Sequence, residues 1–297
     1  MIVYTLLSTK GGVGKTTLAA SIGSIFADFG LRVLLIDADY QPALSKFFHF
    51  SHVAPKGLTA LLTGGALVPE AISTVEVPPP EGYATARQGR VLNPSGKLDL
   101  VYTDAPTGEA EIWLTTKMNY FMRLRQVLHN PLVADLYDVV IIDTQGATGK
   151  LQDAAAVAAD RLILPVSPDT LSTREFLTTT MDLLDRLSST IAHQLPTIQA
   201  ILYKQSNTNN SREIATAVRE RYRQLRGNVS VLNTVIPVAT AFERSASLRL
   251  PVHWIDKRAS QLMHELAWEL VPQFAGVNVS DVVSSAASSG SPSLLEA

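Results

Sequence analysis

The segment that organises this sequence is Ser8-Thr9-Lys10-Gly11-Gly12-Val13-Gly14-Lys15-Thr16-Thr17. It follows an apolar run with the composition of a strand, residues 2–8, and leads into a stretch of helical periodicity, residues 15–29. A glycine-rich segment between a strand and a helix is the context in which a phosphate-binding loop forms. Glycines let backbone N–H groups turn toward phosphate oxygens, and the helix N-terminus adds the positive end of its dipole. The segment therefore predicts a site for nucleotide phosphates.

The side chains of this loop predict ATP and Mg²⁺ as its ligands. Lys15 is placed to lay a positive charge on the β- and γ-phosphates, and the Thr16 hydroxyl can ligate Mg²⁺. The ordinary pattern has glycine where Thr9 stands, and here Lys10 directly precedes the glycine pair. The segment is thus a deviant form of the loop. The residues expected to contact ATP are Lys10, Gly11, Gly12, Val13, Gly14, Lys15, Thr16 and Thr17.

The rest of the chain predicts an α/β fold with a doubly wound, mainly parallel sheet flanked by helices. Short apolar runs alternate with longer stretches of helical periodicity, which is typical of repeated βαβ units. Continuous apolarity indicates strands that are buried on both faces. The expected strands cover residues 2–8, 33–36, 139–142, 162–166, 198–203 and 229–236, and the expected helices cover residues 15–29, 109–128, 151–159, 170–188, 211–226 and 256–271.

Three aspartates are candidates for holding the metal and for catalysis. Asp37 and Asp143 directly follow expected strands, whose carboxyl ends face the ligand in this architecture. We expect both, with Thr16, to hold Mg²⁺ directly or through a bound water. Asp39 is expected to position the attacking water, because phosphoryl transfer needs in-line placement, and it joins the two loop lysines as the catalytic set. Taken alone, such an Asp pair is equally often a turn or a helix cap.

Composition excludes several classes of protein. The 297 residues carry a net charge of -2 and 18% charged side chains, so the chain is no polycation and any nucleic-acid contact must be a local patch. The absence of cysteine excludes disulfides, thiolate zinc sites and iron–sulfur clusters. No basic leader with an apolar core and no membrane-spanning run is evident, so we expect a cytoplasmic protein that uses no membrane.

The domain organisation is expected to be simple. Residues 1–275 are predicted to form a single domain. Residues 77–96 are rich in Pro and Gly and are predicted to be an exposed excursion. Residues 276–297 consist largely of small side chains and are predicted to be a disordered tail.

Several motifs together resemble the ParA/MinD family of P-loop ATPases. The family signature Lys-Gly-Gly-x-Gly-Lys-Thr-Thr matches residues 10–17, and its Asp-x-Asp-Pro-Gln motif is similar to residues 37–41. Tyr40 stands where the family usually has Pro, and Gln145-Gly146 replaces the prolines that usually follow the second acidic strand. Weaker similarity runs through residues 137–146, 158–166, 233–237 and 243–247, so the resemblance spans residues 1–271.

The resemblance implies a P-loop ATPase of the deviant Walker A type that works as a dimer. In this family the early lysine, here Lys10, reaches across the dimer to the partner's nucleotide. The family's Ile-Pro segment lies near the adenine base, which makes Pro237 a candidate base contact; a strand terminator is the alternative. The closest likeness is to ParA-type partition ATPases that lack an N-terminal helix-turn-helix.

One expected helix, residues 211–226, carries a candidate DNA surface. Its arginines at spacings of seven, four and three lie on one face, and apolar residues form another stripe. Such a line can follow a phosphate backbone and give salt-sensitive binding without reading the base sequence. The alternative is a solvated helix face, whereas the resemblance implies nonspecific DNA binding by ATP-bound dimers. The candidate DNA-binding residues are Arg212, Arg219, Arg223 and Arg226.

Three functional classes remain open on this evidence. The first is a ParA-type partition ATPase that associates with the nucleoid when ATP-bound and is stimulated by a ParB-like or other adaptor. The second is a MinD-like spatial regulator or a positioning ATPase for a non-DNA cargo, although residues 279–297 contain no Lys or Arg to support a basic membrane anchor. The third is an ATP-dependent biosynthetic ligase on the same fold.

Overall fold

The computed structural model describes residues 1–8, 11–76, 96–168, 178, 180–183, 185–189, 195–225 and 229–276. Five of the sequence-based predictions fall outside these residues, wholly or in large part. They concern Lys10, Arg226, the excursion at residues 77–96, the helix expected over residues 170–188 and the tail at residues 276–297.

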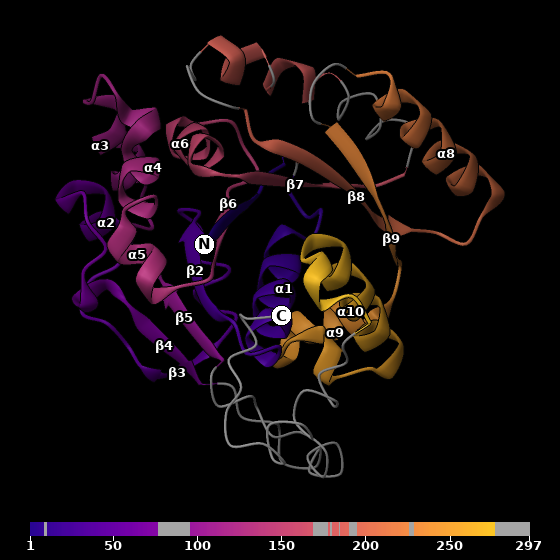
Figure 1. The fold of residues 1–297 in the computed structure, drawn as a ribbon, viewed down its shortest axis with the longest axis horizontal. Coiled ribbons are helices and arrows are strands. Elements are labelled where there is room, and N and C mark those ends of the chain that lie inside the picture. The colour runs from indigo at the N-terminus through magenta and orange to yellow at the C-terminus, as the bar shows by residue number, and fades with distance from the viewer. Residues whose placement is uncertain are drawn as a thin grey trace.

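A sheet of nine strands runs through the described part of the chain, in the order β3-β4-β5-β2-β6-β1-β7-β8-β9 (Figure 1). The β3–β4 and β4–β5 pairs are antiparallel, and all other neighbouring pairs are parallel. The predicted mainly parallel sheet is therefore confirmed. The strands are β1 (Ile2–Leu6), β2 (Arg32–Ala38), β3 (His49–His52), β4 (Ser73–Glu76), β5 (Lys97–Val101), β6 (Val139–Thr144), β7 (Arg161–Val166), β8 (Thr197–Gln205) and β9 (Val229–Pro237).

Helices cover both faces of the sheet, which explains why its central strands are continuously apolar. α1, α9 and α10 pack on one face, whereas α2 to α6 and α8 pack on the other (Figure 1). None of the described helices combines the length and the apolar character that crossing a bilayer requires. The helices are α1 (Lys15–Asp28), α2 (Leu58–Gly64), α3 (Glu109–Thr115), α4 (Arg123–Leu128), α5 (Pro131–Leu136), α6 (Lys150–Ala158), α8 (Asn209–Arg223), α9 (Thr240–Leu248) and α10 (Lys257–Leu270), with the short 3-10 turns η1 (Pro69–Ala71), η3 (Tyr120–Met122), η4 (Val252–Trp254) and η5 (Pro272–Phe274).

The helix expected over residues 109–128 is wrong, because the structure breaks it into α3, η3 and α4. The hydroxyls of Thr115 and Thr116 donate to the carbonyls of Ile112 and Trp113, at 2.6 and 2.7 Å. Threonine hydroxyls that bond to nearby carbonyls compete with the helical ladder. The backbone closes α3 with i to i−3 hydrogen bonds at the same place, so the chain turns before η3.

Three strands were missing from the sequence prediction because their patterns are short or polar. β3 and β4 have four residues each and form the antiparallel edge of the sheet. β5 contains Asp99, which is fully buried and accepts a hydrogen bond from the Tyr137 hydroxyl at 2.6 Å. The ammonium of Lys97 lies 2.6 Å from the same carboxylate. A buried carboxylate with two such partners is tolerated inside a sheet, although it interrupts the apolar pattern.

Candidate nucleotide-binding site

The loop at residues 11–14 joins β1 to α1 at the carboxyl edge of the sheet. Gly12 and Gly14 have φ values of 74° and 83°, in the left-handed region that glycine adopts without strain. A Cβ on Gly14 would lie 2.2 Å from Cζ of Tyr203, so the position also has no room for a side chain. Gly14 is the N-cap of α1, and no side chain caps this helix end. The first N–H groups of α1 are therefore available to phosphate oxygens.

Lys15 and Thr16, in the first turn of α1, lie beside the predicted carboxylates. Lys15 is buried, and burial lowers its pKa while Asp143 and Asp39 act in the opposite direction. The Thr16 hydroxyl donates to Oδ2 of Asp143 at 2.6 Å. Two predicted metal ligands from segments 127 residues apart are thus in direct contact.

Asp37 and Asp143 are register partners on the neighbouring strands β2 and β6. Both are buried. Burial raises the pKa of Asp37 to about 7, while burial and the neighbouring Asp37 raise the pKa of Asp143 to about 8. Oδ1 of Asp143 has no hydrogen-bond partner among the described residues. Two buried carboxylates with an unpaired oxygen beside a threonine hydroxyl fit a hard divalent cation such as Mg²⁺.

Asp37 also has a structural role that the sequence left open. Its carboxylate accepts hydrogen bonds from the backbone N–H of Ser45 at 2.7 Å, from the Ser45 hydroxyl at 2.6 Å and from the N–H of Asp39 at 3.3 Å. Asp39 accepts from the N–H of Gln41 at 2.9 Å. The turn interpretation of this Asp pair is therefore correct, and Asp39 lies in the lining of the cavity described next.

A cavity of about 400 Å³ lies over the loop and has the size of a small-molecule site. One wall consists of loop residues, Asp39 and Gln41, together with Thr144 and Gly146 that follow Asp143. The opposite wall comes from the second half of the chain, and Pro237 lies on it. The sequence analysis assigned no site role to the rest of this wall, although Glu243 and Ala246 fall in the segment 243–247 that resembles the family. These residues are Tyr203, Lys204, Val238, Ala239, Phe242, Glu243 and Ala246.

Lys204, on this second wall, contacts the phosphate loop. Its φ of 58° is left-handed, and the pairing of β8 with β9 shifts register at this point. The Lys204 ammonium donates to the carbonyl of Gly12 at 3.2 Å. A non-glycine residue in this conformation is strained and persists where surrounding contacts hold it. Lys204 therefore adds a second cation to a cavity that already contains Lys15.

The predicted DNA-binding arginines on α8 are not equivalent in the structure. Arg212 and Arg223 are exposed. Arg212 bonds to the side chain of Asn207, and Arg223 pairs with Glu220 at 3.4 Å. Arg219 is half-buried and donates to the carbonyls of two β9 residues, at 2.8 and 3.2 Å. It anchors α8 to β9, which distinguishes it from the two exposed arginines, and its predicted DNA contact stays a prediction.

The loop, the paired carboxylates beside its first helical turn and the cavity over the loop define a P-loop nucleoside triphosphatase. Residues 1–196 match the family model AAA_31, described as "AAA domain". The chain is 31% identical over 277 residues to "Uncharacterized protein MT1749" of Mycobacterium tuberculosis, covering 92% of this chain and 79% of that protein. It is 28% identical to the "Chromosome partitioning protein ParA" of Caulobacter vibrioides, covering 91% and 93% of the two chains.

Among solved structures, apo McdA of Cyanthece superposes with a TM-score of 0.68 at 20% identity, covering 91% of this chain and 98% of that one. Structures with this fold include complexes with ATP and with ADP and magnesium. This chain belongs to the ParA/MinD family of P-loop ATPases. It is an ATP hydrolase whose cofactors are ATP and Mg²⁺.

Proposed function

We propose that this protein is a ParA-type ATPase that partitions or positions a DNA cargo. ATP drives a sandwich dimer, the dimer binds DNA nonspecifically on the nucleoid, and an adaptor on the cargo stimulates hydrolysis and release. The observation that carries the proposal is the deviant loop with Lys10 ahead of Gly11 and Gly12, in a chain similar to a chromosome partitioning protein over nine-tenths of its length. Residues 1–275 act as one ATPase domain in this proposal.

The proposed roles of the site residues combine their places in the structure with the roles that the family resemblance implies. Lys15 neutralises the β- and γ-phosphates, and Asp39, in the lining of the cavity, positions the attacking water. Thr16, Asp37 and Asp143 hold Mg²⁺, which neutralises charge that develops on the phosphates. Two further roles complete the site: Pro237 lies on the far wall and contacts the base, and Lys10 reaches the partner's nucleotide.

The proposed DNA contact uses the exposed edge of α8. Arg212 and Arg223 lie within about 20° of each other around a helix with 3.6 residues per turn, and Arg226 continues the line in the sequence. Three phosphate contacts in each protomer would make six in a dimer. Counterion release then predicts a slope of about −5 for log K against log salt concentration.

DNA retention in the presence of ATP tests this function. We expect Asp39→Ala, which binds ATP and turns over poorly, to retain DNA, and Lys15→Ala, which lacks nucleotide binding, to retain none. The triple variant Arg212→Ala/Arg223→Ala/Arg226→Ala should lose DNA while its ATPase activity remains. Arg221→Ala is the matched control, because Arg221 is exposed on the opposite side of α8.

The outcome separates the classes that the sequence left open. ATP-dependent dimers that retain no DNA at low salt would contradict the partition proposal and favour a non-DNA cargo. Equal retention by the triple variant and by Arg221→Ala would remove α8 as the DNA surface. Pelleting of the ATP-bound protein with anionic liposomes would favour the MinD-like alternative.

A further inference from the structure

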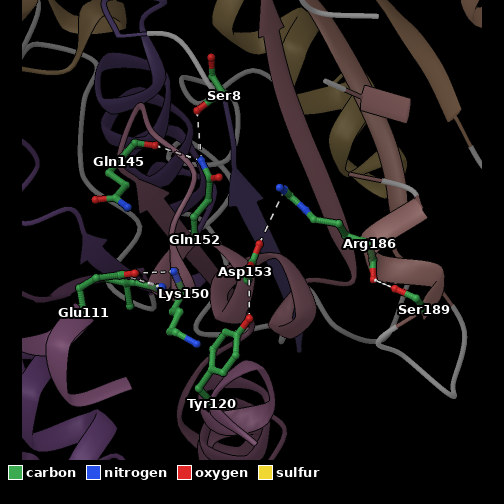
Figure 2. Close-up of polar contacts among 10 residues, drawn as sticks. Ser8, Glu111, Tyr120, Gln145, Lys150, Gln152, Asp153, Arg186 and Ser189 are labelled. Atoms are coloured by element: carbon green, nitrogen blue, oxygen red, sulfur yellow. Dashed lines mark hydrogen bonds and ion pairs between the residues drawn. The ribbon is translucent and has the colours of Figure 1, made fainter. Parts of the chain in front are cut away.

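The first turns of α6 connect the two loops that form the base of the nucleotide cavity. The side-chain amide of Gln152 donates one hydrogen bond to the carbonyl of Ser8 and one to the carbonyl of Gln145, both at 3.2 Å (Figure 2). Ser8 lies two residues after the end of β1 and leads into the phosphate loop. Gln145 is the second residue after Asp143. Gln152 is 1% exposed, so this bridge lies inside the protein.

The bridge fixes two loops that would otherwise diverge. β1 and β6 pair in parallel. Beyond their carboxyl ends, β1 leads into the phosphate loop and β6 leads into residues 145–149. The Thr144 hydroxyl already links β6 to the carbonyl of Leu6 at 2.8 Å. Gln152 adds a second link one step farther out, next to Gly146, which lines the cavity. A primary amide has two N–H donors, one for each carbonyl.

The position of Gln152 is set from outside the nucleotide site. The Glu111 carboxylate of α3 accepts hydrogen bonds from the backbone N–H groups of Lys150 and Leu151, at 2.6 and 2.9 Å (Figure 2). N–H groups at the start of a helix have no partner within the helix, and the helix dipole favours a carboxylate at this end. A Cβ on Gly149 would lie 2.6 Å from the side chain of Gln145 and 3.0 Å from that of Glu111, so this packing is tight.

Asp153, the next residue of α6, is held on its other side. Its carboxylate lies 3.7 Å from the guanidinium of Arg186 and accepts from the Tyr120 hydroxyl at 3.3 Å (Figure 2). The Lys150 ammonium lies 4.0 Å from the centroid of the Tyr120 ring. Contacts from α3, η3 and the helical segment around Arg186 therefore hold α6, and α6 in turn holds Gln152.

We propose that Gln152 is a positioning residue for ATP hydrolysis. It keeps the loop after β6 in register with the phosphate loop, so that Asp143 and the backbone around Gly146 stay in place relative to the γ-phosphate. In-line attack is sensitive to misplacement, and an error of about 1 Å can cost about 100-fold in rate. Binding of the phosphates is shared among Lys15, Lys204 and the backbone N–H groups at the start of α1, so it is less sensitive to the position of the loop after β6. This inference rests on the ATPase activity of the family and is independent of DNA binding.

The test is Gln152→Met, which keeps the length and volume of the side chain and removes both donors. We expect the Kd for ADP with Mg²⁺ and for a non-hydrolysable ATP analogue to stay within threefold of wild type, while single-turnover hydrolysis slows at least tenfold. Hydrogen exchange should report the same change, with the analogue protecting residues 144–149 in wild type and failing to protect them in the variant.

Gln199→Met is the matched control. Gln199 lies on β8 away from the cavity lining. Like Gln152, it has a buried side-chain oxygen without a hydrogen-bond partner in the described part of the chain. We expect it to hydrolyse ATP at the wild-type rate. Three results would overturn the proposal: wild-type hydrolysis by Gln152→Met, an equal loss in both variants, or a loss of nucleotide affinity as large as the loss of rate. DNA retention is measured separately, so failure of the partition proposal leaves this test intact.

Discussion

The contact between Gly14 and Tyr203 gives a sharp prediction for Gly14→Ala. Alanine at φ 83° costs about 1–2 kcal/mol, because the left-handed region is unfavourable for L-residues. Its Cβ would stand 2.2 Å from Cζ of Tyr203, whose ring is 3% exposed and also contacts Phe242 edge to face. Displacing such a buried ring adds about 1–3 kcal/mol, as overpacking does elsewhere. In Gly14→Ala the native conformation of the loop is therefore destabilised by about 2–5 kcal/mol. The affinity for ATP should then fall at least about 30-fold.

A double-mutant cycle with Tyr203→Leu separates the two terms. Leucine removes the ring atoms that meet the new Cβ and leaves the backbone strain, so the double variant should lose only about 5- to 30-fold in affinity. Tyr203→Leu alone should bind ATP nearly as wild type does. The assay is titration with a fluorescent ATP analogue, with thermal unfolding to verify that each variant is folded.

This reasoning is refuted if the effects of the two substitutions on ATP affinity are simply additive in free energy. If Gly14→Ala/Tyr203→Leu binds ATP as weakly as the product of the two single effects, the two sites do not interact and the clash is irrelevant. Wild-type affinity in Gly14→Ala would refute the strain argument as well.

Three further predictions concern charge and anchoring. Because the folded-state pKa values of Asp37 and Asp143 lie above the unfolded value of 3.8, the ligand-free protein should lose stability as pH rises from about 4 to 8. Over the upper part of that range Mg²⁺-nucleotide should bind more tightly and release protons, which calorimetry in two buffers detects. Lys204→Asn should weaken ATP binding several-fold without lowering the melting temperature, since asparagine tolerates the left-handed conformation; an unchanged Kd would contradict a role for this ammonium. Arg219→Ala should lower the free energy of unfolding by about 1–2 kcal/mol through its lost bonds to β9, whereas Arg223→Ala should change it by less than about 0.5 kcal/mol in denaturant titrations.

The sequence predicted the parts of the site that are encoded locally. The glycine loop, Asp37 and Asp143 could be placed because a strand, a turn and a helix follow one another within a few residues. Parallel strands then bring the two carboxylates together, as found in the register of β2 and β6. The turn at Asp39 could be proposed for the same reason.

The remaining features depend on contacts between distant segments. Tyr203 reaches Gly14, and Gln152 joins Ser8 to Gln145, through packing that no local pattern announces. Arg219 shared a helical spacing with exposed arginines, yet only its position over β9 decides that it is an anchor. Periodicity identified which side of α8 is polar and could not tell which cations remain accessible.

The nucleotide cavity takes its walls from segments far apart in the sequence, and the Lys204 to Gly12 hydrogen bond joins residues 192 positions apart. This has a consequence for biosynthesis. A nascent chain on the ribosome contains its phosphate loop before the later elements are made, and it has no pocket until β8, β9 and α9 have left the exit tunnel. ATP therefore stabilises only chains in which these later elements have folded, and a product truncated before β8 carries the recognisable loop without the ability to retain a nucleotide.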